Sequence, residues 1–123
     1  MIPHTVEVQL LALGFLAARN GWVDIAFPIL QAVEQSHPTR AAGYIGLTLA
    51  HFAVGRLQEA VTCAERGLRY VADSEQAELH ALRGIVLHAA GFAHESRQAL
   101  ERAGDCPLAQ DYQTRQMAST RMS

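Results

Sequence analysis

The stretch Val54-Gly55-Arg56-Leu57 places a glycine between two apolar segments of helical periodicity, and the same arrangement occurs twice more. The other copies are Asn20-Gly21-Trp22-Val23 and Ala90-Gly91-Phe92-Ala93, so the three glycines stand 34 and 36 residues apart. A small residue follows each glycine by five positions, and a small or compact one precedes it by seven. These residues are Ala26, Ala60 and Ser96 after the glycines, and Gly14, Thr48 and Gly84 before them. The chain therefore contains three copies of one structural unit.

The repeated glycines predict helix hairpins. A glycine between two helices can adopt the left-handed backbone conformation that ends the first helix without a steric penalty. Small residues at matching positions allow two antiparallel helices to approach closely, and a following proline ends the second helix. No segment shows the alternation of a strand. We therefore predict an all-α fold with helices at 5–19 and 23–36, 39–53 and 57–71, and 75–89 and 93–103.

Two further features concern the helix ends and the domain boundaries. Pro28 falls inside the second helix, so we expect a kink or a late start there. After the third hairpin, Leu108, Tyr112 and Gln116 have helical spacing among polar neighbours. We expect 109–123 to form a weak capping helix with a frayed end from Ser119 to Ser123. The whole chain is expected to be one domain, with repeats at about 7–38, 41–74 and 77–108.

The composition fits one small soluble domain. Of the 123 residues, 50% are hydrophobic and 18% are charged, which is enough apolar surface for a core. The net charge of -2 and the lack of a basic stripe argue against a nucleic-acid partner. Apolar stretches end well before the length of a membrane span and no signal peptide is evident, so we expect no membrane insertion. Two cysteines suit a reducing compartment, and ten basic residues that are all arginine are typical of a high-GC genome, so we expect a cytoplasmic bacterial protein.

The chain carries no arrangement of residues that predicts catalysis or metal binding. Its six histidines include no pair three or four residues apart, the spacing that places two imidazoles on one helix face. We expect them to be packing or rim residues. Cys63 is expected to be a buried apolar residue within a helix, and Cys106, before Pro107, to be more exposed. No glycine loop of a nucleotide-binding type is present. We therefore predict a protein that is not an enzyme and that uses no cofactor and no metal.

The repeated unit resembles the tetratricopeptide repeat, a 34-residue helix hairpin. The matching residues are Leu13-Gly14, Gly21, Ala26 and Pro38 in the first copy, Tyr44, Leu47, Gly55 and Ala60 in the second, and Gly84, Gly91, Leu100 and Ala103 in the third. Ala17, His51 and Leu87 depart from the motif, because the family has Tyr at that position. The resemblance covers about 7–108 and implies a short right-handed solenoid that serves as a binding scaffold.

In this family the first helix of each hairpin lines a concave groove. The resemblance therefore implies a partner-binding groove formed by Val8, Leu11, Phe15, Ala42, Ile45, Leu49, Phe52, Ala81, Ile85 and His88. The same helices need a second apolar side for their hairpin partners, which we assign to Leu10, Leu13 and Ala17, and to Tyr44, Leu47, Ala50 and His51. An exposed apolar groove fits an amphipathic helix or an extended apolar segment of another protein. The groove offsets that hold Lys and Asn in carboxylate-binding relatives carry no cation here, which argues against capture of a C-terminal tail.

The size and the three degenerate repeats also resemble the small chaperones of bacterial type III secretion systems. That resemblance implies a cytosolic chaperone that holds an aggregation-prone helix of a needle or early-secreted subunit in its groove until export. A generic scaffold or adaptor outside secretion is the alternative, and a small enzyme or ligand-binding protein that uses the histidines is a third class. The groove could also be filled by a second copy in a homodimer or by the C-terminal tail.

Overall fold

The computed structural model describes residues 3–122, with side chains described through residue 118, and every regular element in this part of the chain is helical. The elements are α1 (His4–Arg19), α2 (Val23–Ser36), α3 (Ala41–Ala53), α4 (Leu57–Tyr70), a 3-10 turn η1 (Asp73–Glu75), α5 (Ala77–Ala89), α6 (Ala93–Ala103) and α7 (Pro107–Met122). The prediction of an all-α fold is confirmed. The first six helices begin and end within two residues of the ranges expected from the sequence.

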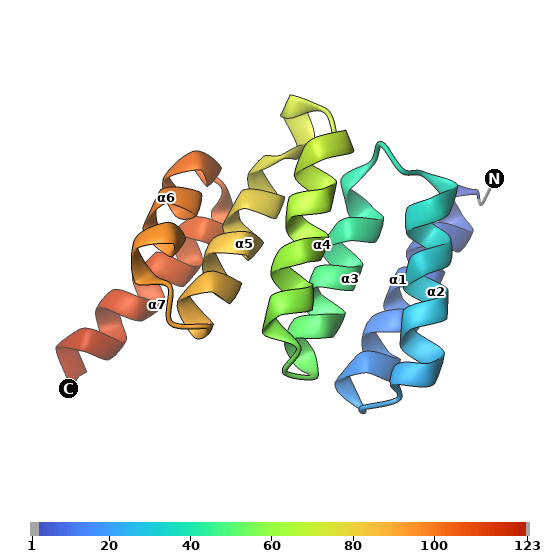
Figure 1. Ribbon diagram of the computed structural model, residues 1–123, viewed down its shortest axis with the longest axis horizontal. Coiled ribbons are helices and arrows are strands. Elements are labelled where there is room, and N and C mark those ends of the chain that lie inside the picture. Colours follow the sequence, from blue (N-terminus) through green and yellow to red (C-terminus); the bar gives the residue numbers. More distant parts are fainter. Residues whose placement is uncertain (1–2, 123) are drawn as a thin grey trace.

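The helices form a row of three pairs followed by α7 (Figure 1). Within each pair, α1 packs against α2, α3 against α4, and α5 against α6. Neighbouring pairs meet because α3 contacts both helices of the first pair and α5 contacts both helices of the second. In the view of Figure 1, α2 and α4 lie in front of α1 and α3. The helix α7 packs against α5 at the end of the row.

The three predicted glycine turns have the same geometry. Gly21, Gly55 and Gly91 have φ angles of 76°, 81° and 93°, the left-handed region that side chains disfavour. In each turn the residue after the glycine donates a backbone hydrogen bond to the carbonyl five residues earlier, over 2.8 to 2.9 Å. This bond closes the end of the first helix of each pair, as expected from the repeat. Gly104, which the repeat does not include, has a φ of 62° in the turn between α6 and α7.

The small residues predicted at the crossings lie where the paired helices touch. A Cβ atom added to Gly14 would lie 2.7 Å from Cδ2 of Leu30, and one added to Gly84 would lie 2.8 Å from Cγ of Leu100. Ser96 is buried and its hydroxyl donates to the Gly84 carbonyl over 2.6 Å. Thr48, Ala26 and Ala60 are also buried. These contacts allow each pair to pack closely.

Two expectations about helix ends need correction or limitation. Pro28 lies inside α2, but the helix begins at Val23, so there is no late start. The capping helix α7 begins at Pro107, two residues before the predicted boundary, and is described to Met122. The expected fraying from Ser119 to Ser123 falls on side chains that lie outside the described part of the structure. For Ser123, the backbone lies outside it as well.

The apolar core is divided among the junctions of the row. One cluster joins the first two pairs and includes Leu30, Leu47, Ala50 and Cys63. A second cluster joins the second and third pairs through Tyr44, Val71 and Leu79. The third cluster joins α5 and α6 to α7, and its buried members are Ala81, Leu100, Ala103, Cys106 and Ala109. Each helix pair is therefore stabilised mainly by its immediate neighbours.

Candidate protein-binding surfaces

The structure places the ten predicted groove residues in three different environments. Val8 has 51% of its surface exposed, and His88 is also exposed. Ala81 is fully buried. The other seven are half-buried: Leu11, Phe15, Ala42, Ile45, Leu49, Phe52 and Ile85. Most of the predicted side chains therefore retain some accessible apolar surface.

Half-burial of the groove residues arises because the first helices of neighbouring pairs touch each other. A Cβ atom added to Gly46 of α3 would lie 3.2 Å from Cδ2 of Leu11 and 3.7 Å from Cζ of Phe15. Ile45 packs in the same way against the cluster that contains Leu79 of α5. These side chains use one side to join α1 to α3, or α3 to α5. Their remaining surface is what a partner can reach.

At the third pair, α7 covers residues that the sequence assigned to the groove. Ala81 lies in the cluster with Leu100 and Ala109, so it presents no surface to a partner, and its assignment as a groove residue is wrong. His88 forms a hydrogen bond through its ring Nδ1 to the Tyr112 hydroxyl of α7, and the two rings meet edge-on at 5.9 Å. A cavity of about 330 Å³ lies beside this contact, lined by side chains of α5, α6 and α7.

The first pair carries the largest share of exposed apolar surface. Among the described side chains, six of the nine large hydrophobic residues that are exposed belong to α1, α2 or the turn between them, and these are Val6, Val8, Leu13, Leu16, Trp22 and Ile25. Leu13 was expected to pack against the second helix of its hairpin, but 54% of its surface is exposed, so that expectation is wrong. Its neighbours Gly14 and Ala17 form the contact instead. Apolar patches of this extent commonly mark protein interfaces.

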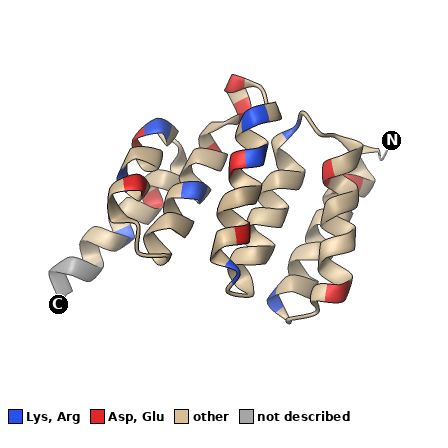
Figure 2. Ribbon diagram, in the orientation of Figure 1, with Lys and Arg blue, Asp and Glu red and all other residues tan. Residues whose placement is uncertain are grey.

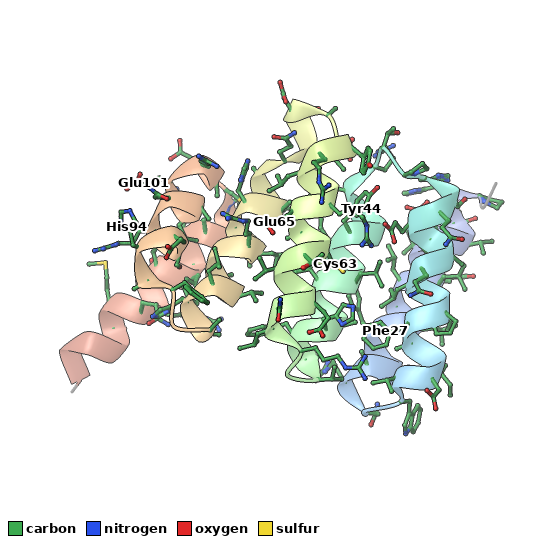
Figure 3. All side chains as sticks on the ribbon, in the orientation of Figure 1. Phe27, Tyr44, Cys63, Glu65, His94 and Glu101 are labelled. Carbon is green, nitrogen blue, oxygen red and sulfur yellow. The ribbon has the colours of Figure 1, made fainter. Side chains whose placement is uncertain are left out.

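The charged residues are sparse on α1 to α3 and more frequent on α4 to α6 (Figure 2). Arg66 of α4 pairs with Glu34 of α2 over 2.7 Å, which links the first two pairs. Arg83 of α5 pairs with Glu65 of α4 over 3.1 Å, which links the second and third; Glu65 is labelled in Figure 3. In contrast, 8–18 and 25–33 contain no Asp, Glu, Lys or Arg. The exposed surface of the first pair is therefore uncharged over most of its length.

The two junctions differ in the side chains that line them. At the first, the rings of Phe27 and His51 lie 4.4 Å apart and the Arg56 guanidinium lies 5.4 Å from the Phe27 ring centre. The equivalent positions at the second junction hold Val61, Leu87 and Phe92. There Val61, Leu87 and the exposed Phe92 line a cleft of about 580 Å³. The repeat alignment locates this apolar cleft, although the sequence analysis did not single it out.

The six histidines lie in different environments: His4, His88 and His94 are exposed, His37 lies 3.3 Å from the Glu7 carboxylate, and His51 and His80 are half-buried. Burial, with a further contribution from neighbouring arginines, lowers the pKa of His51 and of His80. Cys63 lies in the core near Phe27, as predicted, and burial raises the pKa of its thiol (Figure 3). Cys106 is also buried, in the cluster under α7, which corrects its predicted exposure. The described residues contain no group of three His, Cys, Asp or Glu that could hold a metal ion.

No protein-family model matches the chain, and neither a curated protein nor a solved structure is significantly similar to it. Within the described residues, no helix combines the length and the apolar character needed to span a membrane.

Proposed function

We propose that this protein is a binding module of the tetratricopeptide type that holds an apolar helical segment of another protein. In this proposal the three helix pairs form a short right-handed solenoid, α7 caps its C-terminal end, and α1, α3 and α5 line the binding groove. Support for this assignment comes from the three equivalent glycine turns and from the equivalent close crossings at Gly14 and Gly84. Both features repeat at nearly constant spacing along the chain.

The observation that carries the proposal is the apolar surface that remains on the first helices of the pairs. Val8 is exposed, and Phe15, Ala42 and Leu49 are half-buried, so each has surface available for a partner. Few charges interrupt this surface, because neither 8–18 of α1 nor the whole of α3 contains Asp, Glu, Lys or Arg. An amphipathic helix that places apolar side chains every three or four residues matches such a surface.

The specific form of this function that we propose is a bacterial type III secretion chaperone for a needle or early-secreted subunit. A subunit with a polymerising apolar helix gains solubility when that helix is covered, because a chaperone that binds only the unassembled subunit shifts the equilibrium away from polymer. The alternative is a general scaffold or adaptor, whose partner would be stable and soluble alone. Behaviour of the isolated partner separates these two functions.

The test begins with native mass spectrometry of the protein purified gently from its own host. We expect a complex with one small partner protein per chain, and this partner is then produced alone and mixed with the purified protein. The Val8→Glu variant should weaken that binding at least tenfold, because it places a charge against an apolar segment. Val8 is the best site for this test because its exposure leaves the core undisturbed.

Tyr70→Glu is the matched control, because Tyr70 is equally exposed but lies at the C-terminal end of α4. It should bind the partner like the wild type. Equal binding by Val8→Glu and the wild type, with helical content unchanged in circular dichroism, would contradict binding in the groove. A partner that stays soluble and monomeric without this protein would favour the adaptor over the chaperone.

A further inference from the structure

We propose that the free end of the first helix pair is a dimerisation surface, on which a second copy of this chain packs the same surface of its own first pair. We call this surface the end face and define it by the exposed residues Val6, Leu13, Leu16, Trp22 and Ile25. It lies on the side of α1 and α2 that faces away from α3, and it is separate from the groove. The inference therefore does not depend on the proposed function.

The register of the repeat shows what the α1 part of the end face is suited to contact. Leu13 and Leu16 precede Leu47 and Ala50 by 34 residues, so they occupy equivalent positions in the first and second pairs. Leu47 and Ala50 are both buried in the cluster that includes Leu30 of the preceding pair. In the second pair, these positions thus pack against a preceding helix hairpin. In the first pair the same positions are apolar and exposed.

The α2 part of the end face gives the same result. Trp22 is equivalent to Arg56, whose guanidinium lies over the Phe27 ring of the preceding pair. Ile29, half-buried on α2, is equivalent to Cys63, which is buried in the same cluster as Phe27. Both helices of the first pair therefore carry, on their free side, a junction surface that lacks a neighbouring hairpin. A hairpin from another molecule has the geometry to occupy it.

The C-terminal end of the molecule indicates which hairpin of a second copy would contact the end face. The C-terminal end is covered by α7, whose Ala109 is fully buried and whose Gln110, Asp111 and Gln113 are exposed. Among its described side chains, Met117 is the one large apolar residue that is exposed. A head-to-tail contact would press the apolar end face against this largely polar surface. A contact between two end faces instead pairs apolar with apolar and forms a closed two-fold dimer. Because 8–18 and 25–33 carry no charged side chain, the two-fold arrangement brings few like charges together.

The size of the end face is also sufficient. About half of each of its five large side chains is exposed, which together amounts to on the order of 400 Å² per copy. With the half-buried Leu10 and Ile29 at its margin, the apolar area is roughly 500 Å² per copy. A standard interface buries roughly 800 Å² per partner and is about 65% apolar between identical chains, so it needs a similar apolar area. The chain therefore has enough apolar surface for a dimer at this face.

Multi-angle light scattering on the purified protein tests the proposal. At concentrations up to about 100 µM, which populate complexes of micromolar Kd, the wild type should have twice the mass of the 13.4 kDa chain. The double variant Leu13→Glu/Ile25→Glu should be a monomer at every concentration. Trp22 is the only tryptophan of the chain, so its emission should shift to shorter wavelength as the wild-type concentration rises. That shift should be absent in the double variant.

Val8→Glu and Tyr70→Glu are the controls, because both residues are as exposed as Leu13 but lie outside the end face. Both variants should remain dimers, so loss of partner binding by Val8→Glu and loss of the dimer by the double variant are separate outcomes. If the double variant fails to fold by circular dichroism, Leu16→Gln replaces it and should weaken the dimer at least tenfold. A wild type that is monomeric at 100 µM, or a dimer lost only in Val8→Glu, would overturn the proposal.

Discussion

The two ends of this helical row are built differently. At the C-terminal end, α7 lies against α5, buries Ala81 and Ala109, and joins α5 through the His88–Tyr112 hydrogen bond. At the N-terminal end, the described part of the chain places nothing beyond α1 and α2, and Leu13 and Trp22 remain about half exposed. Equivalent positions of one repeat thus lie in a core at one place and on a surface at another.

This difference has a simple physical cause. A hairpin in a row has two faces that need neighbours, because its apolar residues are shared between the pairs before and after it. The helix α7 covers the apolar side of the last pair and exposes Gln110, Asp111 and Gln113 on its outer surface. The first pair keeps an apolar outer surface instead. Among the described residues, the C-terminal end is therefore covered by a largely polar helix, and the N-terminal end exposes apolar side chains.

The largest expected effect compares what two equivalent leucines contribute to stability, one buried at the first junction and one exposed at the free end. Leu47→Ala should reduce the free energy of unfolding by about 3 kcal/mol, because Leu47 is 1% exposed and its removal leaves a cavity at the first junction. Leu13→Ala, at the equivalent position 34 residues earlier, should change it by less than about 0.5 kcal/mol. Urea unfolding at low micromolar concentration, where self-association is minimal, measures both. Equal losses would contradict the contrast between the junction and the free end.

A somewhat smaller effect is expected from detaching α7 from the last helix pair. Ala109→Asp places a carboxylate in the buried cluster under α7 and should detach this helix, at a cost of about 2 kcal/mol. The neighbouring Gln110→Asp, at an exposed position, is the matched control and should be neutral. Urea unfolding and light scattering report stability and association. If α7 has detached, the apolar cluster exposed at the C-terminal end should increase self-association of the chain. Unchanged self-association would argue against α7 as a cap.

The smallest expected effect concerns the interior between the two ends and depends on pH. Burial lowers the pKa of His51 and His80, so the unfolded chain takes up protons before the folded chain does. The stability contributed by their neutral forms is complete above the ordinary histidine pKa of about 6.5 and is lost as the pH falls below it. The melting temperature should therefore drop between pH 7.5 and 5.5. His51→Leu/His80→Leu should reduce this drop, and His94→Leu, at an exposed site on α6, should leave it unchanged.

Several features of the fold could be predicted from local sequence patterns. The turns at Gly21, Gly55 and Gly91 depend on backbone conformations that glycine adopts more readily than other residues. The close crossings follow from small residues at constant distances from these turns, as at Gly14 and Gly84. Burial of Cys63 was predicted from its position in the middle of a helix, because a cysteine there is usually a small buried apolar residue. Such features involve residues that are near one another along the chain.

The candidate binding surfaces were less predictable, because they depend on which elements meet. Ala81 and Cys106 could not be recognised as buried until α7 was found to cover both. Leu13 and Leu47 are the same residue type at equivalent repeat positions, yet one is exposed and the other is buried. The sequence alone thus determined the helices, their turns and the repeat. Only the tertiary structure decided which equivalent apolar side chains are accessible, because burial depends on whether a neighbouring hairpin is present.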